Sequence, residues 1–117
     1  MVALTIYHNP KCSKSRETLE LLESRGLAPR IVKYLETPPS ADELAAIVAR
    51  LGIAPEALVR KGEDIYRSKY AGRSLSDAEW IAAMVEHPIL IERPIVVAGA
   101  RAVIGRPPAN VLTLIQG

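Results

Sequence analysis

The stretch from residue 3 to residue 35, ALTIYHNPKCSKSRETLELLESRGLAPRIVKYL, predicts the first half of the fold. Its apolar residues 3–7 are typical of a short buried strand. A helix should follow over about residues 13–25 and end at Gly26, because glycine is a frequent C-terminal helix cap. Residues 31–35 (IVKYL) indicate a second strand. A strand, a helix and a strand at this spacing form a β-α-β unit, so the two strands should be parallel.

Two capping boxes predict helices in the middle of the chain. In each, a serine stands three residues before a glutamate, so that each side chain can bond the other's backbone N–H group: Ser40 with Glu43, and Ser76 with Glu79. The first helix should end at Gly52 and the second near residues 87–88. A short helix is expected over residues 55–59, whereas the polar residues 61–73 are expected to be mostly loop.

The last part of the chain predicts a hairpin and a final helix. Residues 94–98 (PIVVA) and 102–105 (AVIG) are expected to be antiparallel strands joined by a tight turn. A helix should begin at Pro107-Pro108. The order β-α-β, several helices, β-β-α predicts an α/β protein with a four-stranded mixed sheet. We expect one domain over residues 1–117, with a helical insertion between its two halves at about residues 40–90.

Composition excludes several classes of function. The chain has 117 residues, a net charge of +2 and no long Lys/Arg run, which argues against nucleic-acid binding. Aromatic residues make up 4%, too few for a base-stacking surface. No apolar stretch is long enough to span a bilayer, and the first ten residues are a poor signal peptide. We therefore expect a cytoplasmic protein, a monomer, with no nucleic-acid or membrane partner.

Cys12 is the only cysteine, and its surroundings are polar and basic. A single cysteine excludes an internal disulfide and a metal site built from several thiolates, and with two histidines in the chain we expect no metal. The residue should lie at the N-terminus of the first helix, where backbone N–H groups and the helix dipole favour negative charge. Lys11, Lys14 and Arg16 add positive charge. The pattern predicts a thiolate nucleophile rather than a buried structural cysteine.

Spacing narrows the chemistry of this thiol. A C-x-x-C pair is excluded because position 15 is Ser15, so an outside thiol must complete any redox cycle. The C-x-x-x-x-x-R loop of cysteine phosphatases is excluded because its arginine position is Thr18. A cysteine protease needs a partnered histidine. His8 lies four residues upstream and is a candidate neighbour of the thiol, although a solvated loop histidine fits the sequence equally well.

Three arginines are candidates for binding an anion. Arg60 follows the end of an apolar helix, Arg93 precedes one hairpin strand, and Arg106 follows the other. The planar guanidinium fork matches tetrahedral oxyanions. Because the open ends of an antiparallel hairpin lie side by side, Arg93 and Arg106 should converge. Hairpin geometry does not place Arg60, and any one of the three taken alone also fits a solvated surface residue.

Five stretches together resemble the glutaredoxin-linked arsenate reductases. In chain order they are HNPKCSKSRETL (8–19), YLETPPS (34–40), LVRK (58–61), HPIL (87–90) and RPIVV (93–97). The resemblance covers essentially the whole chain, with similar spacing. Within that family, parts of the sequence such as CSKSRETL and IGRPP are more similar to a branch of uncharacterised relatives.

The resemblance implies a fold and a set of roles. The fold is thioredoxin-like with a helical insertion, which agrees with the element order above. The implied roles are a nucleophile (Cys12), residues supporting its thiolate (His8 and Ser15), oxyanion-binding arginines (Arg60, Arg93 and Arg106) and a cis proline (Pro94).

The function that the resemblance implies is arsenate reduction. The Cys12 thiolate would attack arsenate, glutathione would attack the adduct as co-substrate, and glutaredoxin would resolve the mixed species; no bound cofactor is expected. One alternative is a monothiol, glutathione-linked oxidoreductase that does not act on arsenate. Another is a non-enzymatic regulator that binds RNA polymerase, as some thioredoxin-fold proteins do. The missing C-x-x-C pair, which those regulators typically carry, weighs against it.

Overall fold

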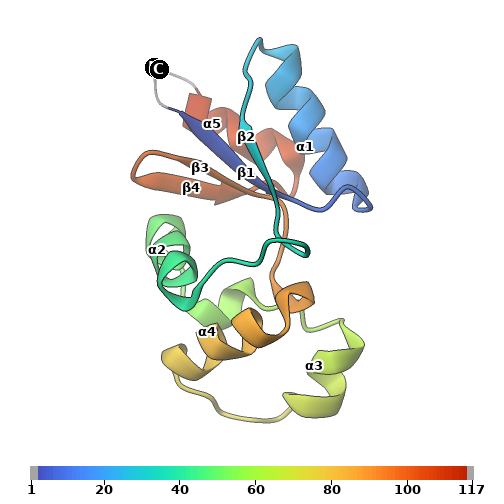
Figure 1. Cartoon of the computed structure of the whole chain (residues 1–117), viewed down its shortest axis with the longest axis vertical. Coiled ribbons are helices and arrows are strands. Elements are labelled where there is room, and N and C mark those ends of the chain that lie inside the picture. The colour runs from blue at the N-terminus through green and yellow to red at the C-terminus, as the bar shows by residue number, and fades with distance from the viewer. Residues whose placement is uncertain (1–2, 116–117) are drawn as a thin grey trace. The chain divides into compact units, whose positions relative to one another are not determined.

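The computed structural model describes residues 3–115, which divide into two compact units (Figure 1). Among the described residues, one unit contains residues 3–37 and 93–115, and the other is the continuous segment Pro38–Glu92. The expectation of a single domain with an insertion at about residues 40–90 stays a prediction. Each unit is described by itself below.

The first unit is built on a four-stranded mixed sheet. Its strands are β1 (Leu4–His8), β2 (Arg30–Lys33), β3 (Ile95–Ala98) and β4 (Arg101–Ile104), in the spatial order β2-β1-β3-β4. β1 and β2 are parallel, as their helical crossover requires, whereas β1 pairs with β3 and β3 with β4 in antiparallel fashion. Gly99, at φ 61°, makes the β3–β4 turn. The predicted thioredoxin-like α/β sheet is confirmed.

Three helical segments pack against this sheet: α1 (Ser13–Ser24), the 3₁₀ helix η3 (Pro108–Val111) and α5 (Leu112–Ile115). Their contact with the strands is an apolar cluster of Leu4, Ile6, Leu22, Val96 and Val111. Since side chains alternate along a strand, His8 lies on the same face of β1 as Leu4 and Ile6, and it is also buried. The hydrophobic core therefore continues directly into the polar end of β1.

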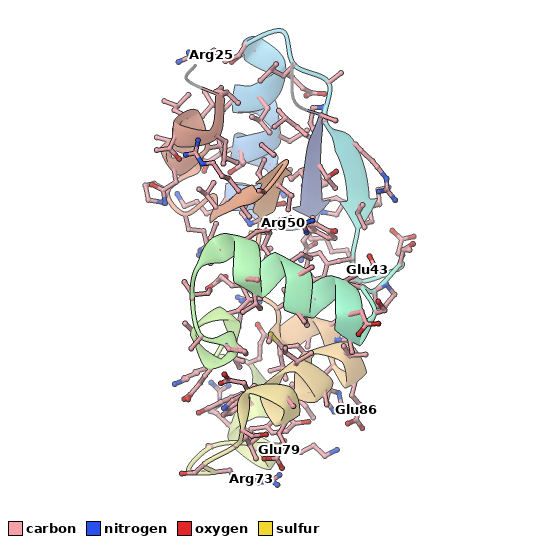
Figure 2. The ribbon with its side chains drawn as sticks, turned by 90° about the vertical axis from the view of Figure 1, so that its left-hand side faces the viewer. Arg25, Glu43, Arg50, Arg73, Glu79 and Glu86 are labelled. Atoms are coloured by element: carbon pink, nitrogen blue, oxygen red, sulfur yellow. The ribbon has the colours of Figure 1, made fainter. Side chains whose placement is uncertain are left out.

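The second unit is helical. It contains α2 (Ala41–Leu51), the 3₁₀ helix η1 (Pro55–Leu58), α3 (Asp64–Lys69), α4 (Asp77–Glu86) and the 3₁₀ helix η2 (Pro88–Leu90). Both predicted capping boxes are formed, with Ser40 opening α2 and Ser76 opening α4. α2 also carries Glu43 in its first turn and Arg50 in its last, and Figure 2 shows them at opposite ends of the helix. These charges complement the helix dipole.

The expectation that residues 61–73 are mostly loop is wrong at α3. The ring of Tyr66 stacks on Trp80 of α4, with centroids 6.2 Å apart, and the ring of Tyr70 lies 6.1 Å from the same indole. Tyr66 and Tyr70 are four residues apart, so a helix places them on one face. The helix is thus stabilised by an aromatic partner that the local polar sequence does not reveal.

Candidate active site around Cys12

Cys12 is the N-cap residue of α1. Its backbone is extended (φ −95°, ψ 124°), its N–H donates to the Asn9 carbonyl at 3.0 Å, and its carbonyl accepts from the Arg16 N–H at 3.0 Å. The side chain makes no capping hydrogen bond to the helix and is 8% exposed. The sulfur therefore lies at the positive end of the helix dipole, where free N–H groups favour an anion.

Hydrogen bonds within the loop before α1 fix its shape. The Asn9 side-chain oxygen accepts from the Lys11 N–H at 3.0 Å. The Arg16 guanidinium donates to the Pro10 carbonyl at 2.9 Å. Arg16 therefore stabilises the conformation of this loop and also adds positive charge near it. These hydrogen bonds restrain the backbone that carries the thiol.

His8 and Ser15 form a buried pair beneath this loop. His8 Nδ1 and Ser15 Oγ are 2.6 Å apart, and the Asn9 N–H donates to the same Oγ at 3.0 Å. Ser15 is fully buried, and its hydroxyl group is shared between His8 and the Asn9 backbone. Burial, followed by the nearby charges of Lys33 and Arg16, lowers the pKa of His8 and so favours the neutral imidazole.

This pair predicts a pH dependence of stability. Because the pKa of His8 is lowered in the fold, the unfolded chain binds the proton more readily. The free energy of unfolding should therefore fall as the pH drops below about 6.5, the ordinary pKa of histidine. A His8→Asn variant keeps an acceptor for Ser15 but cannot titrate, so its loss of stability between pH 7 and 5 should be smaller. Urea unfolding at several pH values measures this, and equal slopes for both proteins would contradict it.

Arg106 brings a guanidinium to the thiol. It follows β4, and its Nη1 lies 3.8 Å from Cys12 Sγ and 3.4 Å from the Arg93 carbonyl oxygen, to which it donates. The Asn110 side chain donates to the carbonyls of Ile104 and Arg106, both at 3.2 Å, and so fixes the backbone at this point. The open ends of the hairpin therefore lie beside the start of α1. A guanidinium at this distance stabilises negative charge on the sulfur.

The other two candidate arginines have different surroundings. Arg93 supplies the carbonyl that Arg106 contacts, its side chain is half-buried, and its peptide bond to Pro94 is cis. Arg60 belongs to the unit Pro38–Glu92 and forms ion pairs with Glu63 at 2.5 Å and Glu92 at 3.6 Å. Oxyanion binding by each of these arginines stays a prediction.

Thr18 and Gly105 also build the site, and the sequence analysis assigned neither a role. Thr18 is fully buried, and its hydroxyl donates to the Lys14 carbonyl at 2.8 Å and lies 3.3 Å from the Gly105 carbonyl. A Cβ on Gly105 would lie 2.6 Å from Thr18 Oγ1 and 2.9 Å from the Pro94 ring. Only glycine therefore lets the end of β4 approach α1 closely enough to bring the next residue, Arg106, to the thiol.

A Gly105→Ala substitution should be strongly destabilising. The added methyl group overlaps two stiff side chains, those of Thr18 and Pro94, so the free energy of unfolding should fall by about 1–3 kcal/mol. Gly62→Ala is the matched control, because nothing lies within 4 Å of its added Cβ. It should change stability by no more than about 0.5 kcal/mol. Urea unfolding compares the two, and equal effects would contradict the close approach at Gly105.

Two kinds of feature are absent from the described residues. Within residues 3–115, no three His, Cys, Asp or Glu side chains gather into a group that could hold a metal ion. Over the same residues, no helix combines the length and apolarity that crossing a membrane requires.

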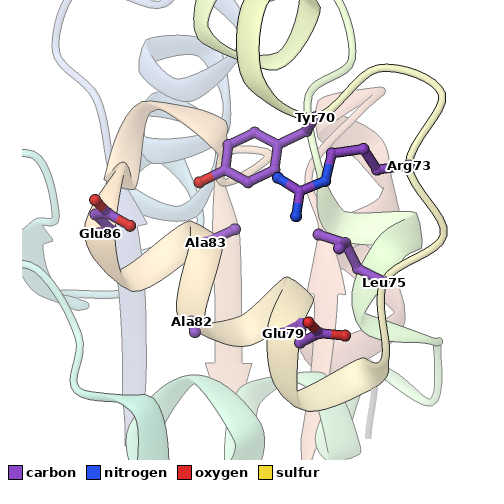
Figure 3. Close-up of a pocket in the computed structure, with 7 residues that line it drawn as sticks. All are labelled: Tyr70, Arg73, Leu75, Glu79, Ala82, Ala83 and Glu86. Atoms are coloured by element: carbon purple, nitrogen blue, oxygen red, sulfur yellow. The ribbon is translucent and has the colours of Figure 1, made fainter.

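A pocket lies in the unit Pro38–Glu92. It is shallow, of about 210 Å³, and Figure 3 shows Tyr70, Arg73, Glu79 and Glu86 around the small alanine side chains of α4. The Arg73 guanidinium lies over the Tyr70 ring, 6.0 Å from its centroid. Its lining has charges of both signs but neither a thiol nor an imidazole. It is therefore a poorer candidate for catalysis than the surroundings of Cys12.

The sequence model of the ArsC family matches residues 7–114, which is nearly all of the chain. The chain belongs to the ArsC family. The matched region includes His8, Cys12 and Ser15 as well as the hairpin that carries Arg93 and Arg106.

Individual ArsC relatives are similar over almost their whole length. "Uncharacterized protein YfgD" of Escherichia coli K12 is 51% identical over 112 residues, which are 94% of each chain. A Neisseria meningitidis serogroup A protein named arsenate reductase is 43% identical over 113 residues, covering 95% of this chain and 97% of that protein. The solved structure of an arsenate reductase from Vibrio cholerae is 53% identical, with a TM-score of 0.93 over 97% of this chain and 98% of that one.

Proposed function

We propose that the protein reduces arsenate to arsenite through its Cys12 thiolate. The observation that carries this proposal is the Arg106 guanidinium 3.8 Å from Cys12 Sγ, at the N-terminus of α1. A nucleophilic sulfur and a cation that fits a tetrahedral oxyanion are thus neighbours. Two family relatives, 43% and 53% identical to this chain, are named arsenate reductases, which supports arsenate as the oxyanion.

The proposed reaction uses one arsenate and two thiols. The Cys12 thiolate forms a sulfur–arsenic bond as an arsenate oxygen leaves as water, and arsenic remains As(V). A glutathione thiolate then attacks the Cys12 sulfur of the adduct. A sulfur–sulfur bond forms and the sulfur–arsenic bond breaks with its electron pair remaining on arsenic, so that arsenite leaves and a Cys12–glutathione disulfide remains. Glutaredoxin thiol exchanges with this disulfide and returns Cys12 to the thiolate. A second thiol must come from outside because Cys12 is the only cysteine.

The charges around the thiol serve the first step. Thiolate and arsenate are both anions, so their approach is unfavourable without cations. Arg106, joined by Arg93 and Arg60, would bind the oxyanion and stabilise the charge that develops on it. His8 and Ser15 support the thiolate indirectly, because their hydrogen bond holds the start of α1 and the preceding loop together. No bound cofactor takes part in this scheme, and glutathione is a co-substrate.

The setting that fits this chemistry is the cytoplasm. Cytoplasmic thiols are kept reduced, so glutathione and glutaredoxin can regenerate the single cysteine. The protein would act there as a monomer, since the residues proposed to react and to bind arsenate all belong to one chain.

An arsenite-formation assay tests the proposal. The purified protein is supplied with arsenate, glutathione and glutaredoxin, and arsenite is separated from arsenate and quantified. We expect arsenite to form only when protein and glutathione are both present. The absence of arsenite in the complete mixture would contradict the proposal.

A monothiol oxidoreductase of the same family is the second candidate. The specific observation in its favour is that Cys12 is the only cysteine, because one thiolate suffices to exchange with a glutathione mixed disulfide. Turnover of such a disulfide by a protein that forms no arsenite would support this candidate instead.

A further inference from the structure

A pocket of about 280 Å³ adjoins the loop that carries the thiol. One wall is formed by residues 8–11, which end immediately before Cys12, and the other by Lys33, Leu35 and Glu36. The walls meet where the parallel strands β1 and β2 end, because His8 pairs with Lys33 in the sheet. Ligands of open α/β sheets commonly bind outside the carboxyl ends of the strands.

The pocket's charges form a specific pattern. Lys11 and Lys33 provide two ammonium groups, and Glu36 provides one carboxylate. The Glu36 N–H donates to the Lys33 carbonyl at 2.9 Å, so a tight turn after β2 keeps these two residues close together. Leu35 is 43% exposed and adds an apolar surface beside the charges. The pocket thus suits a small molecule with two negative groups, one positive group and an uncharged middle.

We propose that this pocket binds glutathione next to the loop that carries Cys12, although Cys12 itself does not line the pocket. Glutathione has two carboxylates, one ammonium and a central cysteine, so its charges complement Lys11, Lys33 and Glu36. Lys11 lines the pocket and is bonded to Cys12, whose Cα is therefore within about 4 Å of the Lys11 Cα. The inference rests on the proposed function, because glutathione is the second thiol of that reaction.

The pocket also separates glutathione from the oxyanion. Arg106, the guanidinium found beside Cys12 Sγ, does not line it. Arsenate and glutathione would therefore use different cations near one sulfur, which allows the adduct to remain in place while the second thiol binds. If arsenate and glutathione compete for this pocket, they do not bind at separate places.

Binding can be measured without any reaction. In a Cys12→Ser protein, S-methylglutathione has no free thiol and meets no nucleophile, so NMR titration of backbone amides reports binding alone. We expect saturable shifts at Asn9, Lys11, Lys33 and Glu36. Shifts absent at this pocket, or shifts that arsenate reverses by competition, would overturn the proposal. This arm gives an answer even if the protein forms no arsenite.

Kinetics test the same pocket in the wild-type cysteine background. Lys33→Gln should raise the KM for glutathione by about fivefold, and the double variant Lys11→Gln with Lys33→Gln by about tenfold or more. Arg30→Gln is the matched control, because it removes one positive charge at the other end of β2, outside the pocket. It should leave the KM unchanged.

Two further comparisons assign the charges. With 2-mercaptoethanol, which has no charged group, the Lys33→Gln variant and wild type should react equally. Glu36→Gln should weaken binding of glutathione but not of N-acetylglutathione, which lacks the ammonium group. If Lys33→Gln slows both thiols alike, or if Arg30→Gln has the same effect, the pocket does not bind glutathione. If no thiol supports arsenite formation, the proposed function is wrong. The NMR titration alone then shows whether the pocket binds glutathione.

Discussion

Replacing Cys12 with serine should reduce arsenite formation by at least about a thousandfold, to the background of the assay. A serine hydroxyl is not ionised near neutral pH, so the attack on arsenate is lost. The electrons are lost as well, because in the proposed reaction the Cys12 sulfur is one of the two atoms that are oxidised. Serine cannot form the disulfide whose formation supplies two electrons to As(V). Excess glutathione should therefore not restore the activity.

The control for this variant lies in the next position. Ser13 is exposed and occupies the first residue of α1, so Ser13→Ala alters the same helix end without touching the sulfur. It should retain most of the activity. Cys12→Ser should also unfold in urea close to the wild-type midpoint, because the change is nearly isosteric. Arsenite formed by the Cys12→Ser protein above background would show that another group carries the reaction.

Replacing Arg106 with alanine should have the second largest effect. Loss of a single preorganised donor at a developing charge typically lowers the rate by about 10²–10³-fold, and we expect kcat/KM for arsenate to fall by that amount. Arg106→Lys should lie between alanine and wild type, because lysine retains the charge but not the planar fork. Steady-state kinetics with saturating glutathione measures both variants.

Arg101 supplies the matched control for this prediction. It lies at the start of β4, at the turn end of the same hairpin, and its guanidinium donates to the Thr113 carbonyl at 2.9 Å. Arg101→Ala should leave kcat/KM nearly unchanged. Arg106 is exposed, so its replacement should shift the urea midpoint little. An equal loss of activity in the two variants, or a loss of folding that accounts for the loss of activity, would mark Arg106 as a structural residue.

The strands and most of the helices could be predicted because their signals are local. Each capping box occupies four consecutive residues, and the β-α-β stretch contains its own strand periodicity and its glycine stop. α3 could not be predicted in this way. Tyr66 of α3 and Tyr70, the residue that caps its C-terminus, both pack on Trp80, which belongs to another helix. A partner supplied by tertiary structure overrides a weak local preference.

The sequence predicted those site residues whose positions follow from the geometry of a helix or a hairpin. Cys12 at the helix start and the approach of Arg106 to Arg93 both follow from simple element geometry. The contact between Thr18 and Gly105 does not, because the need for glycine is set by a residue from a distant part of the sequence. The sequence did place Thr18 one helical turn after Ser15, on the same face of the expected helix. That position was considered only because cysteine phosphatases carry an arginine there, and its burial is seen only in the structure.

The segment Pro38–Glu92 also affects how the sheet can assemble. β1 and β3 pair with each other although they come from near the two ends of the chain, so the pairing closes a long loop. The entropy cost of loop closure grows with the number of freely moving residues in the loop. This segment forms its own compact unit, with a complete capping box on each of its two longest helices. When this segment is folded, fewer residues of the loop move freely, so closing the sheet should cost less entropy than closing a flexible loop of the same length.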